Sequence, residues 1–122
     1  MMKLVELIDA LELQPRSALD NLEADVSGGY ASDLLSDVLA HGKEGNLWIT
    51  LQAHANIVAV ASMKGFAAIL LVGGREPQED TLEKAESERI PILVSRLPAF
   101  ELVGRLYGLG IRGTAPEGSG SA

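Results

Sequence analysis

Polar side chains and glycines stand directly after three apolar stretches of the sequence, at the points where strands are predicted to end. They are Gln52, His54 and Asn56 after residues 47–51, Gly73, Gly74 and Arg75 after residues 66–72, and Ser95 and Arg96 after residues 90–94. In open α/β sheets, ligands bind outside the carboxyl ends of the strands. Arginine side chains and the free N–H groups at helix starts favour an anion there. The pattern therefore predicts a site for a small anion or a nucleotide-like metabolite.

The same residues also allow an interpretation without a ligand. Gly73 and Gly74 would then only make the turn, and Arg75 and Arg96 would be solvated or paired with neighbouring acids. His54 could act as a general base or contact a ligand, or it could only tie down its loop. No serine or cysteine nucleophile is predicted beside His54, so the sequence favours a non-catalytic domain over an enzyme.

The possible metal and nucleotide motifs of the sequence lack the neighbouring residues or elements that such sites need. The two histidines lie in different predicted elements and the chain has no cysteine, so we predict no metal site. The run from Gly108 to Gly113 fits G-x-G-x-x-G, but it follows a predicted helix rather than a strand. Gly42 and Lys43 lack the upstream glycine and the following serine or threonine of a phosphate loop. We therefore predict no bound cofactor.

Length and charge restrict the class of protein and of partner. The 122 residues suit one domain with a single core. A net charge of −7 argues against nucleic acid or an anionic membrane as partner, because both attract clustered lysine and arginine. Every apolar run is shorter than the roughly 20 residues of a membrane span. Glu6, Asp9 and Glu12 interrupt the N-terminal apolar pattern, which a signal peptide would not tolerate, so we expect a cytoplasmic protein.

Apolar periodicity predicts the elements that position these residues. Helices are predicted over residues 3–13, 32–42, 57–64, 77–89 and 98–107. Strands are predicted over residues 47–51, 66–72 and 90–94, with a further short strand between 16 and 29. This alternation indicates a single α/β domain with a mostly parallel sheet flanked by helices. We expect the domain to span residues 1–112 and a flexible, Gly/Ser-rich tail to span residues 113–122.

Local signals give three finer predictions. Ser27, Gly28 and Gly29 are expected to end the strand between 16 and 29. Ser32 is expected to cap the second helix. The last helix is expected to bury Phe100, Val103, Leu106 and Tyr107.

Two segments carry a resemblance to a known family. They are GGYASDLLSDVLAHGKEGNLWITLQAHANIVAVASMKGFAAILLVGGREP over residues 28–77 and IPILVSRLPAFELVGRLYGLGI over residues 90–111. Together they resemble the DRTGG domain family, over nearly all of residues 3–112. The most similar members are stand-alone proteins often encoded beside iron-only hydrogenase genes. Related domains occur in the N-terminal part of HPr kinase/phosphorylase and between the CBS pair and catalytic parts of some inorganic pyrophosphatases.

The signature motif of the family is only partly present. Its Thr-Gly-Gly portion falls on Val72, Gly73 and Gly74, and its Asp-Arg portion falls near Ala53 and His54 without matching either residue. The Gln-x-His-x-Asn pattern of the stand-alone members is matched by Gln52, His54 and Asn56. The resemblance implies a non-catalytic regulatory domain that pairs with its own copy as a homodimer.

Two functions from different classes follow from these observations. The first is a cytoplasmic, dimeric regulatory or ligand-sensing domain that binds a small anionic metabolite at the strand carboxyl ends. The alternative is a protein-interaction or assembly module, associated with hydrogenase and without a small-molecule ligand. Its aromatic anchors for a partner protein would be Trp48, Phe66, Phe100 and Tyr107.

Overall fold

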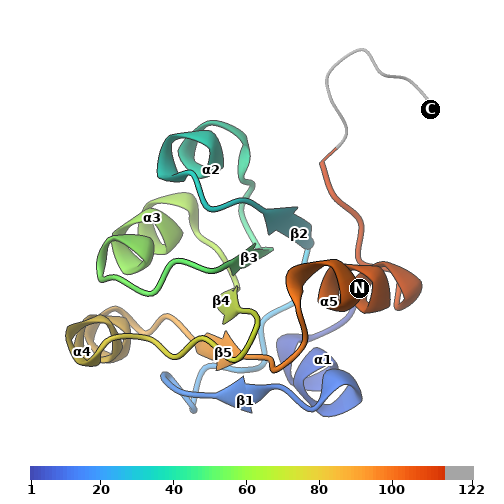
Figure 1. Ribbon diagram of the computed structural model, residues 1–122, viewed down its shortest axis with the longest axis horizontal. Coiled ribbons are helices and arrows are strands. Elements are labelled where there is room, and N and C mark those ends of the chain that lie inside the picture. The colour runs from blue at the N-terminus through green and yellow to red at the C-terminus, as the bar shows by residue number, and fades with distance from the viewer. Residues whose placement is uncertain (115–122) are drawn as a thin grey trace.

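The computed structural model describes residues 1–114, which form one sheet with helices on both faces (Figure 1). The strands are β1 (Gln14–Pro15), β2 (Gly28–Ala31), β3 (Asn46–Thr50), β4 (Ala68–Leu71) and β5 (Ile92–Val94). They lie in the order β1-β5-β4-β3-β2, with β2 to β5 parallel and β1 antiparallel to β5. This confirms the predicted α/β class and mostly parallel sheet. The predicted tail lies outside the described residues from 115 onward.

The helices divide between the two faces of the sheet. The first face is covered by α2 (Leu35–His41), α3 (Asn56–Lys64) and α4 (Glu79–Glu88), and the second by α1 (Leu4–Leu11) and α5 (Ala99–Gly108). The helices α2, α3 and α4 share a face because each joins one parallel strand to the next, and such crossovers keep one hand. Within residues 1–114, no helix is long and apolar enough to cross a membrane.

The strand β3 lies between β2 and β4, and all of its residues are buried. Its side chains alternate between the faces: Leu47 and Ile49 pack toward α1 and α5, and Trp48 packs toward α2 and α3. The Trp48 and Phe66 rings meet edge to face, with centroids 5.9 Å apart. Trp48 Nε1 donates a hydrogen bond to the carbonyl oxygen of Ser32 at 2.9 Å. This contact holds the chain after β2 against β3.

The strand predicted between residues 16 and 29 is wrong in position. The structure begins β2 at Gly28, where the pattern predicts a strand end, and Leu19 of the predicted strand is 63% exposed. The C-terminal segment crosses β2 here: the Gly29 N–H donates to the Arg112 carbonyl at 3.0 Å. A Cβ on Gly28 would lie only 2.7 Å from that oxygen. The glycines therefore mark a close backbone approach within a strand rather than a turn.

The predicted cap of the second helix is also wrong, because α2 begins at Leu35 and Ser32 lies outside it. Ser32 Oγ accepts the Leu34 N–H at 3.2 Å, ahead of the helix. Asp33 turns toward β3 instead, where its Oδ1 accepts the Thr50 hydroxyl at 2.7 Å. Because Asp33 is held at the end of β3, Leu34 stays extended and the helix starts after it.

The prediction for the last helix is confirmed for Leu106, which is buried, and is wrong for Phe100 and Tyr107; Val103 is half-buried. Leu102 and Leu106 are buried, whereas Phe100 is 92% exposed and Tyr107 is 56% exposed. The sequence of α5 carries two apolar stripes, and both have helical spacing. The leucine stripe packs into the aliphatic layer beneath α1 and α5. The aromatic stripe is left on the outside of the molecule.

Candidate functional site

The parallel strands β2 to β5 end at one edge of the sheet, which we call the carboxyl edge. The residues predicted for the site lie in three loops there and at the start of α3: Gln52 and His54 after β3, Asn56 as the first residue of α3, Gly73, Gly74 and Arg75 after β4, and Ser95 and Arg96 after β5. In the sheet, β4 lies between β3 and β5, so the loop with Arg75 is the middle one of the three.

The glycine turn after β4 is bonded to the loop after β5. The Gly74 N–H donates to the Ser95 carbonyl and the Gly73 N–H donates to the Leu97 carbonyl, both at 2.8 Å. Both glycines have positive φ, of 65° and 72°, which explains their residue type. Their N–H groups are occupied and do not cradle an anion. The Arg75 side chain is exposed, and it is not part of any ion pair formed within residues 1–114.

The loop after β3 is held from two sides. Gln52 Nε2 donates to the Asp33 carbonyl at 3.0 Å. The Ala53 carbonyl accepts the Thr81 hydroxyl at 2.8 Å, which ties this loop to α4. His54 and Asn56 are exposed between these anchors. Of the predicted residues that follow β3, Gln52 is therefore engaged within the protein, and His54 and Asn56 face solvent.

A pocket of about 310 Å³ lies at the end of β5, and we call it the β5 pocket. Its lining comes from α1, β1, the loop after β5 and α5: Leu11, Glu12, Gln14, Ser95, Arg96, Leu97 and Arg105. Ser95 is buried and its Oγ accepts the Leu97 N–H at 3.1 Å. Neither Arg96 nor Arg105 belongs to an ion pair formed within residues 1–114. Two cationic side chains and a single acid, Glu12, therefore border one hollow.

Sequence reasoning found Ser95 and Arg96 of this pocket and missed Gln14 and Arg105. Gln14 was not predicted because a residue before a proline is typical of a helix end. The structure instead places it in the two-residue strand β1. Arg105 lies on the polar side of the α5 pattern, which is typical of a solvated residue. No local signal distinguishes Arg105, because Glu101 stands four residues before it, as in an ordinary solvated i,i+4 pair.

An ion pair next to the carboxyl edge links two loops. Arg16 follows β1, and its Nε and Nη2 donate to Glu76 Oε1 and Oε2 at 2.8 and 2.9 Å. This bidentate hydrogen bond raises the pKa of Arg16 and lowers the pKa of Glu76. The only acid in the loop after β4 is thereby neutralised, which lessens repulsion of an anion at this edge.

The Arg16–Glu76 pair should give stability a small pH dependence. The pKa of Glu76 is lower in the folded state, so the stabilisation is present above the unfolded pKa of about 4.3 and is lost as the pH falls through the folded pKa. We expect Arg16→Met to lower the free energy of unfolding by less than about 1 kcal/mol at neutral pH, because the pair is exposed. Urea unfolding from neutral to strongly acidic pH should show that difference shrinking, and Glu76→Gln should abolish it. A difference independent of pH would contradict this role.

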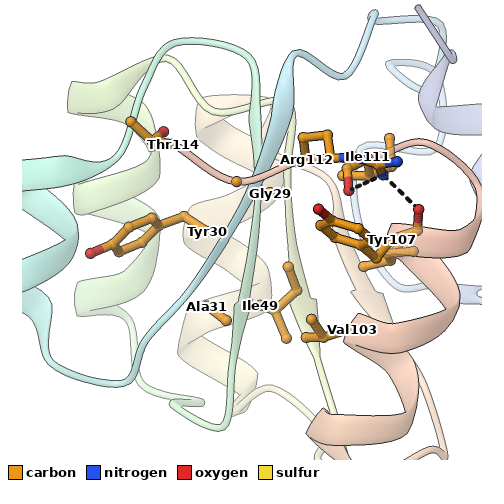
Figure 2. A pocket seen from close by; sticks show the side chains of 11 residues that line it. Gly29, Tyr30, Ala31, Ile49, Val103, Tyr107, Ile111, Arg112 and Thr114 are labelled. Atoms are coloured by element: carbon orange, nitrogen blue, oxygen red, sulfur yellow. Dashed lines mark hydrogen bonds between the residues drawn. The ribbon is translucent and has the colours of Figure 1, made fainter. Parts of the chain in front are cut away.

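A second hollow of about 330 Å³ lies between the edge strand β2 and α5 (Figure 2), and we call it the β2–α5 cavity. Tyr30, Ile49, Val103 and Tyr107 give it mostly apolar walls. Arg112 stacks on the Tyr107 ring, 3.8 Å from its centroid, and donates to the Tyr107 carbonyl at 2.7 Å. Because this guanidinium is already engaged, the cavity suits an apolar group better than an anion.

Tyr30 of β2 and Asp37 and His41 of α2 form a further cluster of polar side chains. Tyr30 OH donates to Asp37 Oδ2 at 2.8 Å, and His41 Nδ1 lies 3.1 Å from Asp37 Oδ1. The bond from Tyr30 lowers the pKa of Asp37 and raises the pKa of Tyr30. The cluster ties α2 to β2. In the described part of the chain, no three carboxylate or imidazole side chains are grouped to hold a metal ion.

Comparison with known proteins gives a structural neighbour. No protein-family model and no curated protein matches the sequence. One similar solved structure contains the CBS and DRTGG domains of the regulatory region of Clostridium perfringens pyrophosphatase, complexed with its activator, diadenosine tetraphosphate. The TM-score is 0.67 over 83% of this chain, at 15% sequence identity. The likeness is one of fold.

The match covers most of this chain but less than half of the neighbour. This chain covers 44% of the length of the solved regulatory region, which holds two kinds of domain. At 15% identity the comparison speaks for the fold and not for the ligand or its site. A DRTGG-like fold is therefore supported.

Proposed function

We propose that this protein is a non-catalytic, cytoplasmic regulatory domain that senses a small anionic or nucleotide-like metabolite at the carboxyl edge. The β5 pocket receives the phosphate or carboxylate group of the ligand. Arg96 and Arg105 supply the charge, and Ser95 and Gln14 supply neutral hydrogen-bonding groups. The proposal keeps Ser95 and Arg96 from the sequence-based prediction and adds two residues to them.

The observation that carries this proposal is the approach of two arginines from different elements to one pocket. Arg96 comes from the loop after β5 and Arg105 from α5. Guanidinium groups bind phosphate and carboxylate with two parallel hydrogen bonds, and each such charged bond contributes about 1.5–3 kcal/mol. A volume of about 310 Å³ lies at the lower end of small-molecule sites, which suits a phosphate group or a sugar phosphate.

A larger ligand would extend from the β5 pocket along the carboxyl edge. Neighbouring strands lie about 4.8 Å apart, so the loop with Arg75 is one strand away and the loop with His54 and Asn56 is two. These three side chains are exposed and would contact the remainder of a nucleotide. Gly73, Gly74 and Gln52 would shape the loops without touching the ligand. The activator named for the structural neighbour is a nucleotide, which supports including nucleotides in a test.

Calorimetric titration and thermal shift with phosphate, pyrophosphate, ATP and diadenosine tetraphosphate test this function. We expect at least one of these to raise the melting temperature, by mass action on the folded state. Arg96→Ala should weaken that ligand by roughly ten- to a hundredfold, since a charged hydrogen bond is lost. Arg89→Ala is the matched control, because Arg89 caps α4 and pairs with Asp20 away from the pocket. Equal binding by Arg96→Ala and the unsubstituted chain, or no ligand in the panel, would contradict the proposal.

The alternative function, a protein-interaction module, has support from one feature. Two of its four aromatic anchors, Trp48 and Phe66, are buried in the core, but Phe100 and Tyr107 are exposed on α5. A ligand-sensing domain can also use such a surface, so the two functions do not exclude each other. Binding of every panel ligand too weakly to detect, with a partner protein bound through α5, would favour the alternative.

A further inference from the structure

The β2–α5 cavity exists because β2 has its smallest side chains on the side that faces α5. Gly29 lies opposite Leu47 of β3 in the parallel register, and Ala31 lies opposite Ile49. Opposite residues of neighbouring strands share one face of the sheet, and these two β3 residues pack in the layer beneath α1 and α5. The positions of β2 in this layer are therefore a glycine and an alanine. They leave a hollow of about 330 Å³, which is within the range of small-molecule sites.

The lining of the cavity is apolar except for one cation. The aliphatic side chains of Ile49, Val103 and Leu106 line it, together with the aromatic ring of Tyr107 (Figure 2). Arg112 is the only charged residue among those of residues 1–114 that line the cavity. Because Arg112 is exposed and stacks on the half-exposed Tyr107 ring, its charge lies at the rim of the hollow. A ligand that matches this lining has an apolar body and one anionic group.

The guanidinium of Arg112 is held in place but keeps free donors. Its main chain is fixed by the Gly29 N–H, which donates to the Arg112 carbonyl at 3.0 Å. Its side chain is fixed by Nη1, which donates to the Tyr107 carbonyl at 2.7 Å. Within residues 1–114, Nε and Nη2 have no hydrogen-bond partner. These two atoms form the edge of the guanidinium that binds a carboxylate with two parallel hydrogen bonds, and their orientation is already set.

We propose that the β2–α5 cavity binds a small monocarboxylate, with an apolar body in the hollow and its carboxylate paired with Arg112 at the rim. The body is an aryl or a short alkyl group, since both bury apolar surface against the aliphatic walls and the Tyr107 ring. Phosphate and pyrophosphate have no apolar part to bury, and one guanidinium edge neutralises only a single charge. The cavity therefore takes a different class of ligand from the β5 pocket.

This inference goes beyond the ligand-sensing function and does not depend on it. The residues that line the β2–α5 cavity and those that line the β5 pocket have no member in common. The helix α5 separates the two hollows, with Val103 and Tyr107 on one side and Arg105 on the other. Substitutions in one hollow therefore leave the other intact, and a failure of one proposal is distinguishable from a failure of the other.

Calorimetric titration of the full chain with phenylacetate, hexanoate and their neutral amides tests the site. We expect saturable binding of at least one carboxylate, with its amide weaker by about tenfold or more, because the amide lacks the charge that pairs with Arg112. Tighter binding of phenylacetate identifies an aryl body and tighter binding of hexanoate an alkyl body, and both results support the site. No saturable binding of either carboxylate at millimolar concentration, or amides that bind as tightly as the acids, would overturn the proposal.

Arg112→Met tests the role of the guanidinium. The affinity for the carboxylate should fall by roughly ten- to a hundredfold, whereas the affinity for the amide should stay unchanged, so that acid and amide bind about equally. The matched control is Arg96→Met, which removes a cation from the β5 pocket and should change the affinity by less than about twofold. A carboxylate that is weakened by Arg96→Met and not by Arg112→Met occupies the β5 pocket, which would overturn this inference and leave the proposed function intact.

Ala31→Ile tests the location of the apolar body. The larger side chain suits a strand and fills the hollow from β2, so it should weaken acids and amides alike by about tenfold or more. Circular dichroism should show the variant folded. In the unsubstituted chain, NMR shifts on addition of phenylacetate should centre on Ala31, Ile49 and Val103, a measurement that needs no variant. Unchanged binding by Ala31→Ile, or shifts centred on Ser95 and Arg96, would contradict a carboxylate site between β2 and α5.

Discussion

Replacing Trp48 with alanine is expected to lower the free energy of unfolding by about 3–5 kcal/mol. Trp48 is completely buried in β3 beneath α2 and α3, packs edge to face with Phe66, and donates a hydrogen bond from Nε1 to the Ser32 carbonyl. Its removal leaves a cavity under α2 and α3 and an unpaired carbonyl oxygen. Urea unfolding at one fixed protein concentration, followed by circular dichroism because the chain has no other tryptophan, measures the loss.

Trp48→Phe separates the two contributions. Phenylalanine keeps an aromatic ring against Phe66 but cannot donate to Ser32, so we expect a smaller loss, above about 1 kcal/mol. A loss below about 1 kcal/mol for Trp48→Ala would show that this side chain does not hold the sheet and α2 together.

Replacing Ser17 with alanine is expected to lower the free energy of unfolding by about 2–4 kcal/mol, which is large for the loss of one hydroxyl group. Ser17 is buried, and its Oγ donates to the Ile90 carbonyl at 2.8 Å and accepts the Ile92 N–H at 2.9 Å. Alanine leaves both backbone groups buried without a partner, and these groups lead directly into β5. Urea unfolding of Ser17→Ala gives the loss.

The exposed serine of α3, Ser62, provides the matched control. Ser62→Ala removes the same group from a solvated position and should change the free energy of unfolding by less than about 0.5 kcal/mol. Equal effects of the two substitutions would mean that Ser17 does not pin the start of β5.

Much of the fold was predictable because its signals are local. The strands at Asn46–Thr50, Ala68–Leu71 and Ile92–Val94 are short apolar runs, and the helix at Asn56–Lys64 between them is apolar on most sides. The edges of the sheet were not predictable. Gly28 and Gly29 pair with Asn46 and Leu47 of β3, and the Arg112 carbonyl approaches Gly28 too closely for a larger residue. Both contacts join distant parts of the chain.

The candidate site also has one part that the sequence predicted and one part that it did not. Ser95 and Arg96 follow from the rule that ligands bind where parallel strands end, which needs only the order of elements. Arg105 and Gln14 reach the β5 pocket through the packing of α5 and β1 beside β5, which no local pattern encodes. The exposed Phe100 was missed for a related reason, since the two apolar stripes of α5 have the same spacing and only the packed sheet distinguishes them.

An NMR titration of the isotope-labelled chain with pyrophosphate tests the ligand site most directly. We predict saturable shifts concentrated at Ser95, Arg96 and Leu97, with accompanying shifts at Gln14 and Arg105, because these residues line the β5 pocket. The same titration of Arg96→Ala should give much weaker shifts at the same positions. Shifts centred on the β2–α5 cavity, or no saturable shift at millimolar pyrophosphate, would contradict an anion site at the end of β5.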